Sequence, residues 1–106
     1  MKWAELNDDE RTELIRTHVL DGQMSQRYSE ISKYALIEVV ILLMEAKDCP
    51  FIQVIWMHPR RNPGVKQFGA QFWCKKLDTE ASAFADNPAD AILEAAVLAS
   101  LGRLSL

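Results

Sequence analysis

The segment from Tyr34 to Met44 constrains the fold most, because its apolar residues surround a helix almost completely. Glu38 is its only charged residue. We expect this helix to be capped by Ser29 and to run to about Lys47, with Glu38 on a narrow solvent face. A helix that is apolar all round is buried all round, either inside its own domain or against another chain. The rest of the chain must therefore supply elements that cover it.

The segments that follow this helix have the composition of β-strands. Residues 51–57 are rich in β-branched and aromatic side chains, and residues 68–74 form a second such run, with Gly69 as a candidate bulge. The sequence at 62–64, Asn-Pro-Gly, is typical of a chain reversal. A short third strand is predicted from residue 81 to 84. This pattern indicates a small antiparallel sheet.

Two further helices are predicted from their terminal residues. Asn7 and Glu10 form the pattern of a capping box, and Gly22 is a candidate stop. Residues 87–90 place Asn at the N-cap, Pro at the first helical position and an acid at the third, and Gly102 ends that helix. The predicted order is α-α-β-β-(β)-α.

Length and composition agree with one small globular domain. The chain has 106 residues, of which 49% are hydrophobic and 25% are charged. We therefore predict a single domain, 1–106, of the α+β class, in which helices at 29–47 and 88–101 pack on the sheet. The start lacks a secretory apolar region, and the longest apolar run is about half of a membrane span. We expect a cytoplasmic protein with no membrane contact.

Charge is separated along the chain. No acidic residue occurs from Cys49 to Leu77, and that stretch has a charge of +5, whereas the rest sums to −8 and the whole chain to −3. A positive hairpin on a negative body can orient a partner. The candidate partner-binding residues, here called the basic set, are His58, Arg60, Arg61, Lys66, Lys75 and Lys76.

Three interpretations of the basic set remain open. Arginines can meet an acidic patch on a protein partner. They can also bind the phosphates of a nucleic acid, with Trp56 or Trp73 stacking on a base. The third is a solvated turn that keeps an exposed hairpin soluble. A double-stranded RNA-binding module is disfavoured, because residues 86–90 are acidic where that module needs lysines.

No catalytic or metal-binding pattern stands out. His18 and His58 each lack a second ligand at metal-binding spacing, so we expect no metal, no cofactor and no enzymatic activity. If the hairpin turns near Asn62, Cys74 lies opposite Phe51 and Cys49 falls close by. Reduced, buried thiols are the expected state in the cytosol, and a disulfide is the alternative.

Three segments together resemble a known family. They are Tyr28-Ser29-Glu30-Ile31 before an apolar helix, Phe72-Trp73-Cys74 in a strand, and residues 85–92, Ala-Asp-Asn-Pro-Ala-Asp-Ala-Ile, before an Ala/Leu-rich helix. This arrangement, over residues 12 to 102, resembles the phage ABA sandwich domain family. Family members usually place tryptophan in a Trp-x-Val-x-Phe strand, whereas here tryptophan follows phenylalanine. The resemblance implies a phage or prophage origin and α/β/α layering, and it implies no activity.

We therefore expect a small phage- or prophage-encoded accessory protein that binds a host or phage protein without chemistry. One concrete form of such a binding protein is an inhibitor of a host defence complex. The alternative is a nucleic-acid-binding protein that uses the hairpin at 58–66. The apolar helix also predicts a homodimer, with Val40, Leu43 or Met44 near the contact.

Overall fold

The computed structural model describes residues 3–20, 33–57, 60–61, 64 and 66–104. The elements are a 3-10 turn η1 (Trp3–Glu5), the helices α1 (Asp8–His18), α2 (Lys33–Ala46) and α3 (Pro88–Leu101), and the strands β1 (Phe51–Trp56), β2 (Phe68–Cys74) and β3 (Thr79–Ala85). The predicted α+β class and the order of elements are confirmed. The third strand is longer than predicted.

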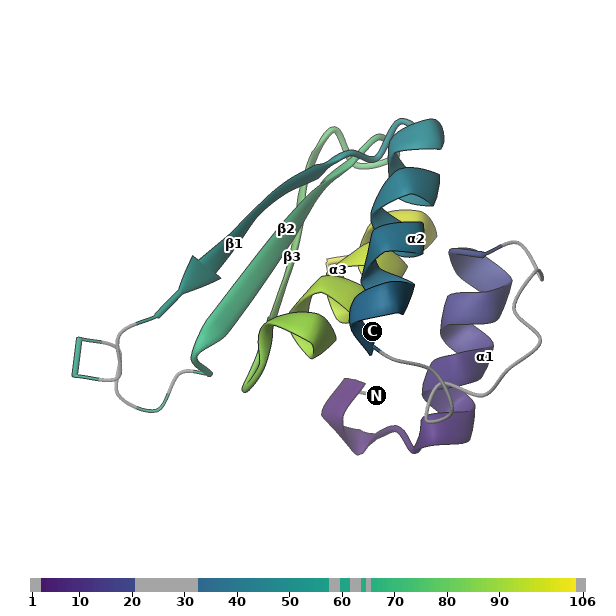
Figure 1. Ribbon diagram of the computed structural model, residues 1–106. Helices are drawn as coiled ribbons and strands as arrows, with labels where there is room; N and C mark the ends of the chain where they lie inside the picture. The colour runs from purple at the N-terminus through teal and green to yellow at the C-terminus, as the bar shows by residue number, and fades with distance from the viewer. Residues whose placement is uncertain (1–2, 21–32, 58–59, 62–63, 65, 105–106) are drawn as a thin grey trace.

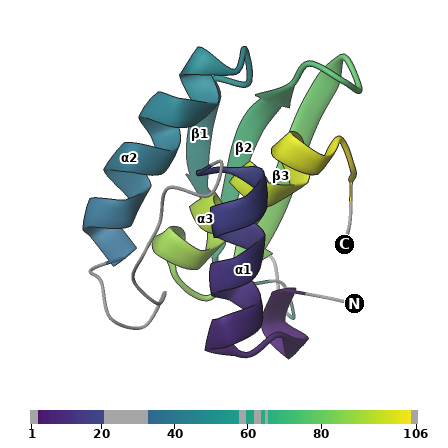
Figure 2. The ribbon, with the colours of Figure 1, turned by 90° about the vertical axis from the view of Figure 1, so that its right-hand side faces the viewer.

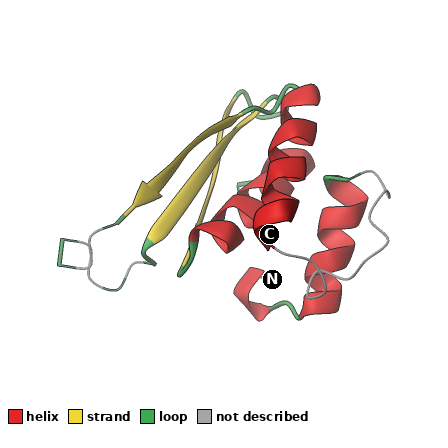
Figure 3. Cartoon of the chain, in the orientation of Figure 1, coloured by secondary structure: helices red, strands yellow, loops and turns green. Residues whose placement is uncertain are grey.

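The three strands form an antiparallel sheet in the order β1-β2-β3. The helices lie together on one side of this sheet (Figures 1 and 3). Seen from the helical side, α1 and α2 lie in front, and α3 lies between them and the strands (Figure 2). The layers of the described chain are therefore sheet, α3 and then α1 with α2, whereas the family resemblance implies α/β/α.

The helix that is enclosed on nearly all sides is α3. From Ala91 to Ala99 all its residues except Glu94 are buried, and many of them are alanines that let the helix approach the sheet closely. By contrast, the expectation that α2 is buried all round is wrong within this chain. Leu42 of α2 is 67% exposed, and Val39 is also exposed. Glu38 is exposed, as predicted.

Capping interactions fix the start of α1 and both ends of α3 as predicted, whereas α1 ends at His18 with Val19 as its C-cap, before the predicted stop at Gly22. The Asn7 side chain accepts a hydrogen bond from Glu10 N at 2.9 Å, and the Glu10 carboxylate accepts one from Asn7 N at 3.1 Å. Asn87 Oδ1 accepts from Asp90 N at 2.9 Å at the start of α3. Gly102 ends α3 with φ of 70°, a left-handed conformation that favours glycine. The predicted signals at Gly22, Ser29, Asn62 and Pro63 lie outside the described residues.

The strand register corrects two predictions about the hairpin, namely the position of its bulge and the residue that pairs with Phe51. The irregularity lies in β1 between Phe51 and Gln53, and not at Gly69. Gly69 instead leaves room for the ring of Phe84 on the neighbouring strand. Phe51 pairs with Phe72 and not with Cys74. The pairing from Trp56 to Gln53 already places residue 51 one position away from the expected register, and the bulge shifts it by one more.

Candidate functional site

The basic set does not form one surface. Arg60, Arg61 and Lys66 belong to the loop between β1 and β2, which lies at the end of the sheet farthest from the helices (Figure 1). Lys75 and Lys76 follow β2 at its other end, and a strand of this length spans about 20 Å. Lys75 and Lys76 therefore do not share a surface with the cations of the β1–β2 loop. His58 lies outside the described residues.

Both lysines at the β2–β3 turn have structural neighbours. Lys75 Nζ lies 3.0 Å from Asp48 Oδ2 at the end of α2. Lys76 Nζ donates to Ser100 O at 3.2 Å, near the last turn of α3. These contacts connect the turn to the two helix ends.

Arg60 and Arg61 are exposed at the hairpin tip, a name that here means the described loop residues Arg60, Arg61 and Lys66. Trp56, at the end of β1, is 58% exposed on the same end of the sheet. Its pairing with Phe68 places it on the helical side of the sheet, but β1 projects beyond the helices here (Figure 1). Exposed tryptophan beside arginines is the composition enriched at the centres of protein interfaces.

The charge of Lys66 acts on a carboxylate that the sequence analysis did not single out. Glu94 is half-buried on α3, and burial raises the pKa of its carboxyl above the ordinary value of 4.5. The charges of Lys66 and Arg11 oppose this rise in pKa, and the charge of Asp90 adds to it. The signal available in the sequence was a lone carboxylate within the apolar run of the last helix. Lys66 and Glu94 therefore influence each other electrostatically.

Arg11 also organises the N-terminal turn. Its guanidinium lies 5.5 Å from the centroid of the Trp3 ring and donates to Trp3 O at 3.2 Å. Trp3 is buried, and its Nε1 has no hydrogen-bond partner among the described residues. This cluster anchors η1 against the helices, and we assign it a structural role.

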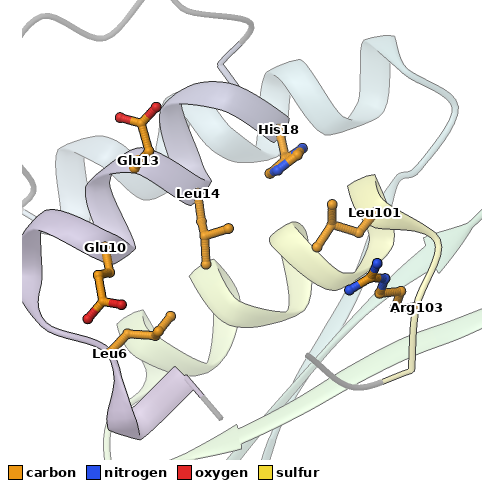
Figure 4. A pocket seen from close by; sticks show the side chains of 7 residues that line it. All are labelled: Leu6, Glu10, Glu13, Leu14, His18, Leu101 and Arg103. Carbon is orange, nitrogen blue, oxygen red and sulfur yellow. The ribbon is translucent and has the colours of Figure 1, made fainter. Parts of the chain in front are cut away.

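An open pocket of about 530 Å³ lies between α1 and the end of α3 (Figure 4). Leu6, Leu14 and Leu101 form its apolar part, and the Glu13 carboxylate points away from α3. The Glu10 carboxylate accepts the capping hydrogen bond from Asn7 N, and Glu13 contacts Arg16 and Thr17. The remaining polar residues, His18 and Arg103, do not make a catalytic arrangement with a nucleophile.

The sheet face opposite the helices carries a row of polar side chains. Gln53 Nε2 donates to Gln71 Oε1 at 2.7 Å, and Gln71 Nε2 donates to Glu80 Oε2 at 3.1 Å. The exposed rings of Trp73 and Phe84 flank this row. Alternating strand periodicity could have located these residues, but the sequence alone did not show which face the helices would leave open.

Within the ranges that the structure describes, no three His, Cys, Asp or Glu side chains come together to hold a metal ion. None of the described helices is long and apolar enough to span a membrane.

Comparison with known proteins adds no relative. No protein-family model, curated protein or solved structure matches this chain. The resemblance to the phage ABA sandwich domain family therefore stays a prediction from the quoted residues.

Proposed function

We propose that this chain is a non-catalytic binding protein whose hairpin tip meets a protein partner. One observation carries the proposal: Trp56, Arg60 and Arg61 are exposed together on a hairpin that projects beyond the helices (Figure 1). A projecting tryptophan supplies apolar area to an interface, and arginines supply directional hydrogen bonds to carboxylates.

The partner that fits this tip has an acidic patch beside an apolar pocket. Opposite charges would guide its approach, and insertion of Trp56 into the pocket would supply most of the affinity. From the sequence resemblance we further propose a phage or prophage origin, with action in a bacterial cytoplasm. Inhibition of a host defence complex by steric blockade is the concrete form of this proposal.

A protein partner is favoured over a nucleic acid by the distribution of charge. Binding to a phosphate backbone is strengthened by each additional cation that neutralises a phosphate. Here Lys75 contacts Asp48 and Lys76 contacts Ser100, both at the far end of β2. Lys66 interacts electrostatically with the Glu94 carboxyl. The tip therefore offers a short patch and not an extended basic track.

A pull-down with two matched charge reversals tests the proposal. Tagged wild type, Arg60→Glu/Arg61→Glu and Lys75→Glu/Lys76→Glu proteins are immobilised, exposed to nuclease-treated bacterial lysate and washed. Each double variant reverses two exposed cations, but only the first changes the tip. We expect a protein that is retained by the wild type and by the lysine variant, and is lost with the arginine variant.

Circular dichroism of all three proteins checks that the fold is retained. Equal retention by all three proteins, or retention by none, would contradict the proposal. A protein that the wild type retains from untreated lysate but not from nuclease-treated lysate would indicate instead that a nucleic acid bridges the contact.

A further inference from the structure

We propose that Cys49 and Cys74 form a redox modification site: a buried cross-strand dithiol that closes to an intramolecular disulfide when it meets a low-molecular-weight disulfide. Both are free thiols in the structure. The site lies at the base of the hairpin, beside the end of α2, and does not depend on the proposed function of the tip.

The strand register places the two cysteines opposite each other. Phe51 pairs with Phe72, and Trp73 N donates to Pro50 O at 2.9 Å. This hydrogen bond extends the antiparallel pairing one residue beyond β1, because Pro50 then lies opposite Trp73. The next position along both segments brings Cys49 opposite Cys74.

The side chains also share a face. The rings of Phe51 and Phe72 meet edge to face at a centroid distance of 5.3 Å on the helical side of the sheet. Alternation along a strand returns a side chain to the same face after two residues. Cys49 and Cys74 are 7% and 0% exposed and belong to the same core, which agrees with this placement.

The expected spacing suits a disulfide. Pro50 and Trp73 form a hydrogen-bonded pair, so the neighbouring pair of Cys49 and Cys74 is of the non-hydrogen-bonded type. Cα atoms of such pairs are about 4.5 Å apart, which lies within the range of ~4.4–6.8 Å that disulfides span. Cys74 Sγ donates to Ala99 O at 3.5 Å in the reduced state, and closure replaces this weak contact.

The closure proceeds by two thiol–disulfide exchanges. The Cys49 thiolate, at the more accessible of the two positions, attacks one sulfur of glutathione disulfide, whose S–S bond breaks and releases one glutathione thiolate. The Cys74 thiolate then attacks Cys49 Sγ and releases the second glutathione. The cysteines lose one electron pair to glutathione, and their two protons balance the two glutathione thiols formed.

The disulfide would tie the end of α2 to β2 and enclose the whole hairpin in a covalent loop. Such a loop restricts the unfolded chain and so stabilises the folded one. The reduced form is the default where glutathione and thioredoxin keep thiols reduced, so the bond reports exposure to an oxidising environment.

Mass spectrometry tests the chemistry. Native protein is incubated with glutathione disulfide, alkylated and weighed intact. We expect the wild type to lose two hydrogens without a retained glutathione, and dithiothreitol to reverse the change. Cys74→Ala, which removes the second thiol, is expected to keep one bound glutathione at Cys49. A disulfide-linked dimer, or a wild-type chain that retains glutathione, would overturn the proposal.

Buried thiols can react slowly with glutathione disulfide in the folded protein. A second experiment therefore forms the disulfide in denaturant, where both thiols are accessible, and then refolds the protein. If the two positions are neighbours in the fold, the oxidised chain regains the native circular dichroism spectrum, and its Tm rises by on the order of 10 °C. An oxidised chain that fails to refold, or that melts below the reduced chain, would overturn the proposal.

Discussion

The ring of Phe84 lies directly over Gly69 on the neighbouring strand. A Cβ added at position 69 would be 2.8 Å from Phe84 Cε1. The two residues pair across β2 and β3, so the contact is a cross-strand contact on the face opposite the helices. We therefore expect Gly69→Ala to destabilise the protein by about 1 kcal/mol, because the ring must move off the strand. Urea unfolding measures this change.

A double-mutant cycle distinguishes this contact from a general effect of alanine at position 69. In the Phe84→Ala background the ring is absent, and Gly69→Ala is expected to cost nothing or to stabilise slightly, because alanine reduces the entropy of the unfolded chain. An equal cost in both backgrounds would show that the ring does not set the need for glycine.

Lys47 joins two distant parts of the chain. Its Nζ donates to His18 O at 3.1 Å and to Val19 O at 2.9 Å, at the C-terminal end of α1. We expect Lys47→Met to destabilise the protein by about 1 kcal/mol, because the carbonyls of His18 and Val19 then lose the charged donor that Lys47 supplies. Lys75→Met, which removes only an exposed pair with Asp48, is the control and is expected to cost less than about 0.5 kcal/mol. Equal costs in thermal or urea unfolding would refute the bridging role of Lys47.

Glu94 gives stability a pH dependence of known sign. Burial raises the pKa of its carboxyl above 4.5 in the folded state. Between the unfolded pKa and this raised pKa, the folded state holds a proton that the unfolded state has released, so the free energy of unfolding falls as pH rises. Glu94→Gln removes the ionisable group, and with it the cost of holding a half-buried charge above that pKa. We expect it to stabilise the protein relative to wild type at pH 7, and to have little effect below the unfolded pKa.

The exposed Glu38→Gln variant serves as the control for the pH series. A stabilisation by Glu94→Gln that is the same at low and neutral pH would show that the effect does not arise from ionisation of Glu94.

The homodimer stays a prediction, but the residues expected near its contact need revision. Val40 and Met44, predicted near the contact, are fully buried, and Leu43 is half-buried, so these side chains offer little exposed surface to a partner. Among the large apolar side chains of α2 whose burial the structure describes, Leu42 is the most exposed. If α2 forms the dimer contact, light scattering of the wild type gives about twice 12.1 kDa at micromolar concentration, and Leu42→Glu lowers the mass to that of one chain.

Leu104→Glu is a matched control, because Leu104 is 65% exposed and Leu42 is 67% exposed. This variant is expected to keep the wild-type mass. A wild-type mass of 12.1 kDa at every concentration would mean that the chain is monomeric.

Local signals predicted most of the fold. The capping box at Asn7, the Asn-Pro start of α3 and the left-handed Gly102 are each defined by neighbouring residues, and the structure has all three. The second strand, from Phe68 to Cys74, also has its predicted bounds. Such signals act within a few residues, so one sequence contains enough information to locate them.

Features that depend on packing between elements were not predictable in this way. Both α2 and α3 are apolar, and the sequence favoured α2 as the enclosed helix. The alanines of α3 allow it to approach the sheet more closely, so α3 takes the central position and Leu42 stays exposed. Similarly, the separation of charge along the chain did not show that the length of β2 places Lys75 and Lys76 far from the arginines.

Site-specific photo-crosslinking in bacterial cells tests the proposed binding role most directly. A photoreactive amino acid replaces Arg61 at the tip or Leu77 in the β2–β3 turn, both of which are exposed. The proposal predicts that the position 61 probe crosslinks to one defined protein, and that the position 77 probe does not. Crosslinks that are the same from both positions, or that form only with nucleic acid, would contradict it.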